Sequence, residues 1–228
     1  MNIIDTSSGT TSINKSCGSI KNIPLFRTKG IQYQIDIHKF ENIIFQSISS
    51  AAFFNEFESL KNKNVFSMGK STQDYLSKQG IKSVCPSIPG SEELKKLLSK
   101  NKKSGNYLIV KGENGLNEIS NYLNSTNKYV EEINCYKRFK LESYENIRNE
   151  FYDADAIIFP STYAFKIFFE EIYSTKVKAK LFGISKRIID YISSYDLDSD
   201  FIDYFSKDIT ESIKAVSYTH LTLPTMDH

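Results

Sequence analysis

The stretch that decides the fold is residues 41–80, ENIIFQSISSAAFFNEFESLKNKNVFSMGKSTQDYLSKQG. Its apolar run at 43–45 is typical of a buried strand, and apolar residues at helical spacing follow from Ala52 to Leu60. Residues 65–68 are typical of a second strand, and a second helix is expected to begin at Gly69-Lys70-Ser71-Thr72. Strands that alternate with helices at this short spacing predict a parallel sheet flanked by helices.

The same order of elements returns later in the chain. In DADAIIFPSTYAFKIFFEEI, at residues 153–172, Phe159 matches Phe45 at an offset of 159 − 45 = 114. In KAKLFGISKRIIDYI, Gly183 matches Gly69, and 183 − 69 is again 114. Two matched pairs at one offset predict two homologous half-domains.

Two extended stretches are predicted to connect two lobes. They are IPLFRTKGI at 23–31 and EEINCYKRF at 131–139. We expect residues 1–24 together with 139–215 to form the first lobe and residues 25–138 to form the second. The predicted fold class is α/β, with two small lobes, each a parallel sheet flanked by helices, joined by a two-stranded connector. The last residues, VSYTHLTLPTMDH at 216–228, continue no pattern, and we expect a non-native tail there.

The remaining elements follow from local signals. Two prolines close a strand expected in SVCPSIPG at 83–90, and Ser91 is expected to cap the helix SEELKKLLSK. NYLIVKG predicts a strand that ends at Gly112, and residues 198–215 predict a last strand and helix. The polar stretch at 5–19 is a poor helix former, because Ser, Thr and Gly weaken helical hydrogen bonding.

Composition excludes several classes of function. A net charge of +2 over 228 residues gives no argument for nucleic-acid binding, because a binding face would need clustered Lys and Arg. The three cysteines have no CxxC spacing, which disfavours a zinc site and a disulfide scaffold and suits a reducing cytoplasm. No apolar run approaches the roughly 18 residues of a membrane span. We therefore expect a soluble cytoplasmic monomer that acts on a small molecule, without a nucleic-acid or membrane partner.

Familiar catalytic motifs are missing. A phosphate-binding P-loop ending in Gly69-Lys70-Ser71 would need a glycine at position 64, where Asn64 stands. A His-based triad or metal site would depend on His38, the one histidine outside the tail. The sequence therefore gives no ground for nucleotide hydrolysis or for a metal centre.

Small polar residues instead follow the predicted strands. Backbone N–H groups at a helix start, together with the helix dipole, favour an anion, so these turns predict binding of a polyanionic small ligand. For any single serine, capping of its own helix is the favoured explanation, and the prediction of an anionic ligand depends on the whole set of turns. The candidate substrate-binding residues are Ser47, Ser49, Ser50, Gly69, Lys70, Ser71, Thr72, Lys111, Gly112, Ser161, Thr162, Gly183 and Ser185.

The order of these stretches resembles the uroporphyrinogen-III synthase family. The resemblance runs from about Pro24 to Asp196 through FQSISSAAFF, VFSMGKSTQDYLSKQG, GSEELKKLL, YLIVKGENGLNEISNYL, VEEINCYKRF, IIFPSTYAFKIFF and LFGISK. Gln46 and Pro160 depart from it, since they replace the threonine of the family's two F-T-S turns. Lys186 stands where its second G-x-x-T turn would have threonine.

The resemblance implies a lyase that needs no cofactor and no metal. Its substrate would be hydroxymethylbilane, a linear tetrapyrrole with eight carboxylates. Loss of the terminal hydroxyl gives an azafulvene, and the ring closes through a spiro intermediate with inversion of the last pyrrole. The product, uroporphyrinogen III, serves haem or sirohaem biosynthesis. Unaided closure gives the non-inverted isomer I, so the main task of the protein would be positioning.

The resemblance also implies one catalytic residue. Tyr136 takes the place of the tyrosine in the family's V-Y-R-R segment, here C-Y-K-R, and would assist departure of the hydroxyl as a hydrogen-bond donor or weak acid. The alternative for Tyr136 is packing of the connector strand. Lys70, Lys111 and Lys137 would attract substrate carboxylates. The alternative for the whole chain is a non-catalytic, two-lobed binder or sensor of an anionic metabolite.

Overall fold

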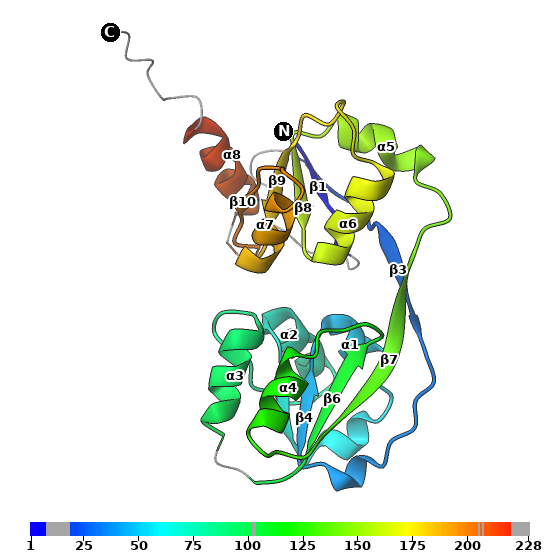
Figure 1. Cartoon of the computed structure of the whole chain (residues 1–228), viewed down its shortest axis with the longest axis vertical. Coiled ribbons are helices and arrows are strands. Elements are labelled where there is room, and N and C mark those ends of the chain that lie inside the picture. The colour runs from blue at the N-terminus through cyan, green and yellow to red at the C-terminus, as the bar shows by residue number, and fades with distance from the viewer. Residues whose placement is uncertain (8–18, 102–103, 205, 207, 220–228) are drawn as a thin grey trace. The chain divides into compact units, whose positions relative to one another are not determined.

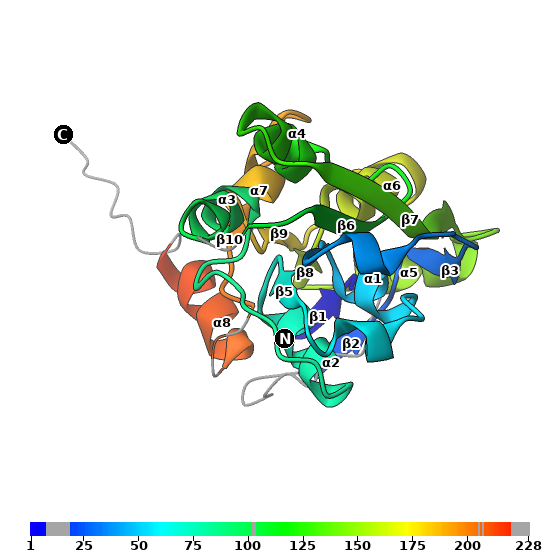
Figure 2. The ribbon, with the colours of Figure 1, turned by 90° about the horizontal axis from the view of Figure 1, so that it is seen from below.

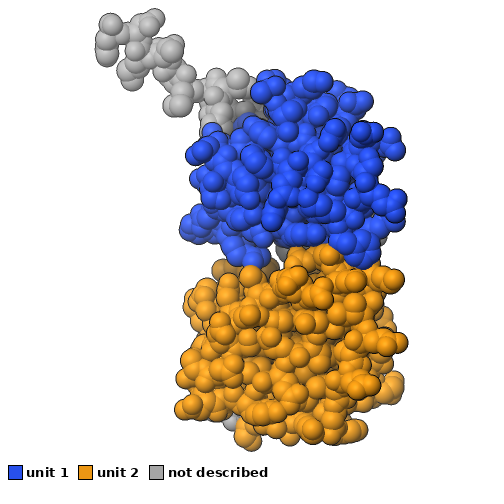
Figure 3. Space-filling model, turned by 45° about the vertical axis from the view of Figure 1, so that its right-hand side comes forward, with its two compact units in different colours: residues 1–27, 139–228 blue, residues 28–138 orange. Residues whose placement is uncertain are grey.

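The computed structural model describes residues 1–7, 19–101, 104–204, 206 and 208–219. The chain divides into two compact units (Figure 1, Figure 3). Unit 1 comprises residues 1–27 and 139–228, and unit 2 comprises residues 28–138. The boundaries thus fall at 27/28 and 138/139, where the sequence led us to expect 24/25 and 138/139.

Unit 1 is built on a five-stranded sheet with the order β10-β9-β8-β1-β2, and its paired strands run parallel. Helices α5, α6 and α7 pack on one face, and the buried Ile209 and Ile213 of α8 pack on the other. The strands are β1 (Asn2–Asp5), β2 (Ser19–Asn22), β8 (Ala156–Phe159), β9 (Lys180–Gly183) and β10 (Asp200–Phe201). The helices are α5 (Glu145–Tyr152), α6 (Thr162–Glu171), α7 (Lys186–Ser193) and α8 (Ile209–Thr219).

Unit 2 holds the second sheet, with the order β3-β7-β6-β4-β5. Helices α1 and α2 cover one face and α3 and α4 the other, as seen end-on in Figure 2. The strands are β3 (Phe26–Gly30), β4 (Asn42–Phe45), β5 (Asn64–Ser67), β6 (Tyr107–Gly112) and β7 (Val130–Lys140). The helices are η1 (Ile37–Lys39), α1 (Ile48–Ala52), η2 (Phe57–Leu60), α2 (Lys70–Lys78), α3 (Ser91–Ser99) and α4 (Glu118–Ser125).

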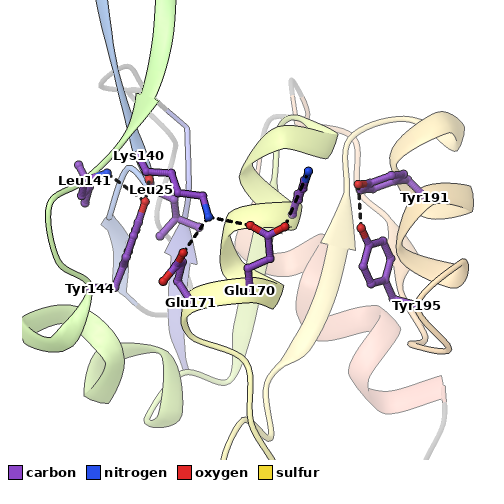
Figure 4. Close-up of polar contacts among 9 residues, drawn as sticks. Leu25, Lys140, Leu141, Tyr144, Glu170, Glu171, Tyr191 and Tyr195 are labelled. Carbon is purple, nitrogen blue, oxygen red and sulfur yellow. Dashed lines mark hydrogen bonds and ion pairs between the residues drawn. The ribbon is translucent and has the colours of Figure 1, made fainter.

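The chain passes from unit 1 to unit 2 through β3 and returns through β7, and these two strands are neighbours in the sheet. Within unit 1 the ends of both strands are fixed, as Figure 4 shows. The Tyr144 hydroxyl donates to the Leu25 carbonyl at 2.8 Å. The Lys140 ammonium pairs with Glu170 and Glu171, each at 2.7 Å.

The predicted fold class, two α/β lobes with helix-flanked parallel sheets, is confirmed, but the repeat has a different register. Strand β4 ends at Phe45 and β8 at Phe159, an offset of 114. Phe45 pairs with Ser67 of β5, whereas Phe159 pairs with Gly183 of β9, so the second strands correspond at 183 − 67 = 116. The match of Gly183 with Gly69 was therefore wrong by two residues, since Gly183 is the last residue of its strand and Gly69 lies beyond one.

Several local expectations were also wrong. The helix expected through 52–60 is broken, because the Asn55 N–H donates to the Tyr33 hydroxyl at 2.8 Å instead of to a helical carbonyl. SVCPSIPG forms only a single bridge, between Phe66 and Val84. Gly90, not Ser91, is the N-cap of α3. Strand β2 was missed, and α8 continues four residues past Ala215. Most of the polar stretch at 5–19, and the tail from residue 220, lie outside the described residues.

In the described part of the chain, none of the helices has both the length and the apolar character needed to cross a bilayer.

Candidate active site

Ser47 and Tyr136 meet at the carboxyl edge of the sheet in unit 2. Their side-chain oxygens lie 3.0 Å apart, and either can be the donor. Ser47 follows β4 and Tyr136 lies on β7, and both strands are neighbours of β6. Phe45 pairs with Val110 and Tyr136 with Gly112, so the parallel register brings both residues to one edge.

A bulge in β7 turns Tyr136 toward Ser47. The register passes from Lys111–Asn134 to Gly112–Tyr136, so Cys135 is the extra residue. Simple alternation would put Cys135 and Tyr136 on opposite faces, yet both pack in the core beneath α1 and α2. The bulge therefore aims the phenol at the start of α1.

Ser47 is held in place by a capping box. Its Oγ accepts the Ser50 N–H at 3.0 Å, and the Ser50 Oγ accepts the Ser47 N–H at 3.0 Å. The Ser50 hydroxyl also donates to the Ser47 carbonyl at 2.7 Å. The Ser47 Oγ, which contacts Tyr136, is therefore fixed at the helix start before any ligand arrives.

Tyr136 is itself tightly enclosed, with 7% of its surface exposed. Its ring stacks on Phe53 with centroids 6.0 Å apart and planes 23° apart. A Cβ at Gly112 would lie 2.4 Å from Tyr136 Cζ, so the phenol occupies space that only a glycine leaves open. Gly112 thus has a role in packing the ring.

The bulged Cys135 is a packing residue. Its thiol is fully buried and lies 3.4 Å from the Ser50 carbonyl and 3.5 Å from the Lys111 carbonyl. Burial raises the pKa of the Cys135 thiol to about 12. A thiol that stays protonated is a poor nucleophile, so Cys135 is unsuited to covalent catalysis.

Lys111 lies in a different environment from the one expected of it. Its side chain is buried, pairs with Glu132 at 2.7 Å and donates to the Asn117 Oδ1. Asn117 is the N-cap of α4, so Lys111 fixes the turn after β6 to the neighbouring strand β7. Its charge is matched inside unit 2 by Glu132.

The other candidates of unit 2 lie at the starts of α1 and α2. Gly69 is the N-cap of α2, and the Lys70 side chain is exposed and pairs with Asp74 at 3.0 Å. Thr72 is buried and Ser71 half-buried. Ser49 is half-buried within the first turn of α1.

Unit 1 repeats this design at the carboxyl edge of its own sheet. The Ser161 Oγ accepts the Ala164 N–H at 3.1 Å and caps α6, as Ser47 caps α1. Thr162 is the first residue of α6. Gly183 ends β9, and Ser185 is the N-cap of α7, where the described residues show no capping bond from its side chain.

Asp5 was missed by the sequence reasoning. It ends β1, is fully buried, and accepts from the Ser7 N–H and hydroxyl, both at 2.9 Å, and from the Tyr204 hydroxyl at 2.6 Å. The signal was present, because the polar run Asp5-Thr6-Ser7 directly follows the apolar Ile3-Ile4 of a strand. Asp5 holds the turn after β1 and the segment around Tyr204 together.

Among the described residues, no three His, Cys, Asp or Glu side chains gather closely enough to hold a metal ion.

The comparison with protein families decides the identity. The model described as "Uroporphyrinogen-III synthase HemD" matches residues 18–204, which is most of the chain. The chain belongs to the uroporphyrinogen-III synthase family. The resemblance inferred from the sequence is confirmed, and with it the assignment to an enzyme family. The alternative of a non-catalytic binder is not favoured.

Solved structures of uroporphyrinogen-III synthases share this fold. The enzyme from Helicobacter pylori matches with a TM-score of 0.68 and 14% identity, over 96% of this chain and 99% of that one. A mutant enzyme from Thermus thermophilus matches with a TM-score of 0.58 and 10% identity, over 97% of this chain and 99% of that one. No curated protein sequence matches the chain.

Proposed function

We propose that this chain closes hydroxymethylbilane to uroporphyrinogen III, and that Tyr136 and Ser47 act on the hydroxyl that leaves. The family match over residues 18–204 supports the reaction. The observation that carries the assignment of residues is the 3.0 Å contact between the two hydroxyls at the carboxyl edge of the unit 2 sheet.

The hydrogen bonds around Ser47 allow a donor role for Tyr136. The Ser47 Oγ accepts the Ser50 N–H and can also donate its own proton to the Tyr136 oxygen. The Tyr136 proton can then point to the terminal hydroxyl of the substrate. Donation to that oxygen assists its departure as water, and loss of the N–H proton of the terminal pyrrole leaves the azafulvene. The terminal carbon of the azafulvene then bonds to the substituted α-carbon of the last pyrrole to give the spiro intermediate. The original bond of that pyrrole to the chain breaks, and the ring closes with the pyrrole inverted.

The candidates at the starts of α2, α6 and α7 would receive substrate carboxylates. Helices α2, α6 and α7 each begin after a strand with N–H groups that have no partner within the helix. Ser71, Thr162 and Ser185 add hydroxyls at these starts. With a net charge of only +2, the chain offers little general attraction to a substrate with eight carboxylates. The N–H groups at the helix starts would therefore supply the binding.

The proposal extends to the conditions of the reaction. The enzyme would work without metal or cofactor, as the resemblance to its family implies, and we expect a cytoplasmic monomer. Dialysis against EDTA should leave the rate unchanged, and sedimentation at working concentration should give a species near 26.1 kDa.

One assay tests the proposed function. The purified chain is incubated with hydroxymethylbilane, and the oxidised products are separated into isomers I and III. Isomer III in excess over a protein-free control supports the proposal. If only isomer I forms, at the same rate as in the protein-free control, the chain would instead be a non-catalytic binder.

A further inference from the structure

The short helix α1 contacts Tyr136 at both of its ends. Ser47, its N-cap, touches the Tyr136 hydroxyl, and Phe53, its C-cap, stacks on the ring. The Phe53 N–H donates to the Ser49 carbonyl at 3.0 Å, which ties the backbone of Phe53 to the helix. One five-residue helix therefore sets two of the contacts that orient the phenol.

Two glycines bound this pair of rings. A Cβ at Gly30 would lie 2.9 Å from Phe53 Cδ1, and one at Gly112 would lie 2.4 Å from Tyr136 Cζ. Gly30, Phe53, Tyr136 and Gly112 all belong to unit 2. The two rings thus lie between the backbone of Gly30 and the backbone of Gly112. Backbone is less free to move than a side chain, so the space for the rings is well defined.

Phe53 also separates Tyr136 from an open pocket. A hollow of about 950 Å³ is lined by Gly30, Tyr33 and Phe53 together with other residues of 30–34 and 52–56. Tyr136 is not among its lining residues. Loss of the Phe53 ring would open this hollow toward the face of Tyr136 and give the phenol room to turn.

The Ser47 contact alone leaves the ring plane of Tyr136 undetermined, because one hydrogen bond fixes a distance and not a rotation. The flat contact with Phe53, together with the Gly112 backbone against the ring, supplies the missing restraint. We propose that Phe53 is a positioning residue, which sets the direction of the Tyr136 hydroxyl toward the substrate. This inference rests on the proposed function.

The test compares two matched substitutions in two backgrounds. Phe53→Leu removes the flat ring but keeps an apolar side chain, and Phe57→Leu makes the same change at a ring that contacts Phe54. Misplacement by 1 Å can cost roughly 100-fold, so for the partial loosening in Phe53→Leu we expect kcat to fall about tenfold at unchanged KM. Phe57→Leu should leave kcat within about twofold of wild type, and Phe53→Tyr, which keeps the ring, should restore the rate.

The Tyr136→Phe chain is the second background, and it distinguishes a positioning role of Phe53 from a purely structural one. In a Tyr136→Phe chain the hydroxyl is absent, so adding Phe53→Leu should lower kcat by no more than about twofold. An equal loss in both backgrounds, or no loss in wild type, would overturn the inference. If the unsubstituted enzyme forms no isomer III at all, the proposed function itself fails. This result differs from the two outcomes that would overturn only the inference about Phe53.

A readout that needs no turnover completes the test. In a chain labelled with ¹³Cζ-tyrosine, the NMR signal lost in Tyr136→Phe identifies Tyr136. Phe53→Leu should broaden or shift that signal, and Phe57→Leu should not. An unchanged line in Phe53→Leu would also overturn the inference.

Discussion

The side-chain oxygens of Ser47 and Tyr136 lie 3.0 Å apart, although 89 residues separate them in the chain. Parallel pairing of β4 and β7 with the strand between them brings them to one edge, and the bulge at Cys135 turns the phenol inward. The same serine caps α1 through the Ser50 N–H. The Ser47 hydroxyl thus both stabilises the start of α1 and orients Tyr136, the candidate general acid.

Ser47→Ala should therefore lower both stability and turnover. Loss of an N-cap serine costs about 1 kcal/mol, which chemical denaturation can measure. Turnover should fall as well, because Tyr136 loses the partner that fixes its hydroxyl. The matched control for stability is Ser161→Ala, since Ser161 makes the same cap on α6. A change in Ser47→Ala that lowers stability but leaves the rate intact would reduce Ser47 to a helix cap.

The serine caps could be predicted from the sequence, whereas the direction of the Tyr136 side chain could not. Ser47 and Ser161 follow apolar strands and precede helical spacing, which is a local signal. The position of Tyr136 depends on a bulge, and nothing in NCYKR marks where a strand will gain its extra residue. The roles of Gly112 and Phe53 depend on that bulge in turn, so they could not be found before it.

Cys135 should resist thiol reagents in the folded protein. Its thiol is buried and its pKa is raised to about 12, so the thiolate is scarce at neutral pH. In a chain with Cys17→Ser and Cys85→Ser, a disulfide reagent at pH 8 should label Cys135 only on addition of denaturant. Labelling of the native chain within minutes would contradict the burial described for β7.

Glu170 should contribute stability that depends on pH. Its hydrogen bond with Lys140 lowers the pKa of the Glu170 carboxyl below its ordinary value. A carboxyl with a lower pKa in the folded chain stabilises the fold above its unfolded pKa, and this contribution is lost as the pH falls through the folded value. Wild type should melt above Glu170→Gln at pH 7, and the difference should shrink as the pH falls below the unfolded pKa of about 4.3 and vanish below the lowered folded pKa.

The control for this experiment is Glu58→Gln in unit 2, whose exposed carboxylate pairs with Lys61. The Glu58 side chain is 87% exposed and pairs with one lysine, whereas Glu170 is 38% exposed and pairs with both Lys140 and Lys166. Because the more exposed pair contributes less, the melting temperature of Glu58→Gln should lie closer to wild type than that of Glu170→Gln at pH 7. A difference between wild type and Glu170→Gln that persists unchanged at pH 3 would show that packing, not charge, underlies it.

The last helix should tolerate truncation only beyond its buried residues. Ile209 and Ile213 of α8 pack against the unit 1 sheet, so a chain that ends at Ala215 keeps both. Its melting temperature should stay within about 2 °C of the full chain, the range of surface changes. Ile213→Ala should cost about 2–5 kcal/mol, as loss of a buried isoleucine does. Equal melting of wild type and Ile213→Ala would contradict this packing.

Lys111 shows another limit of sequence reasoning. Its place after an apolar strand predicted an exposed lysine that attracts carboxylates. The partner that changes this, Glu132, is 21 residues away on the next strand, and only the register of β6 and β7 brings it within 2.7 Å. The register of distant strands decides which lysines form ion pairs and which can bind a ligand. The order of strands and helices in the sequence does not determine that register.

The most direct measurement of the central claim is turnover of hydroxymethylbilane by Tyr136→Phe, with the isomer ratio determined in the same samples. The substitution removes the hydroxyl and keeps the ring against Phe53 and Gly112. General acid assistance is typically worth 10²–10⁴-fold, and because this hydroxyl leaves readily unaided, we expect a loss of about 10²-fold or less. Product formed by the enzyme should remain isomer III. An unchanged rate would assign Tyr136 to packing, and a shift toward isomer I would show that it positions the substrate instead of assisting the leaving group.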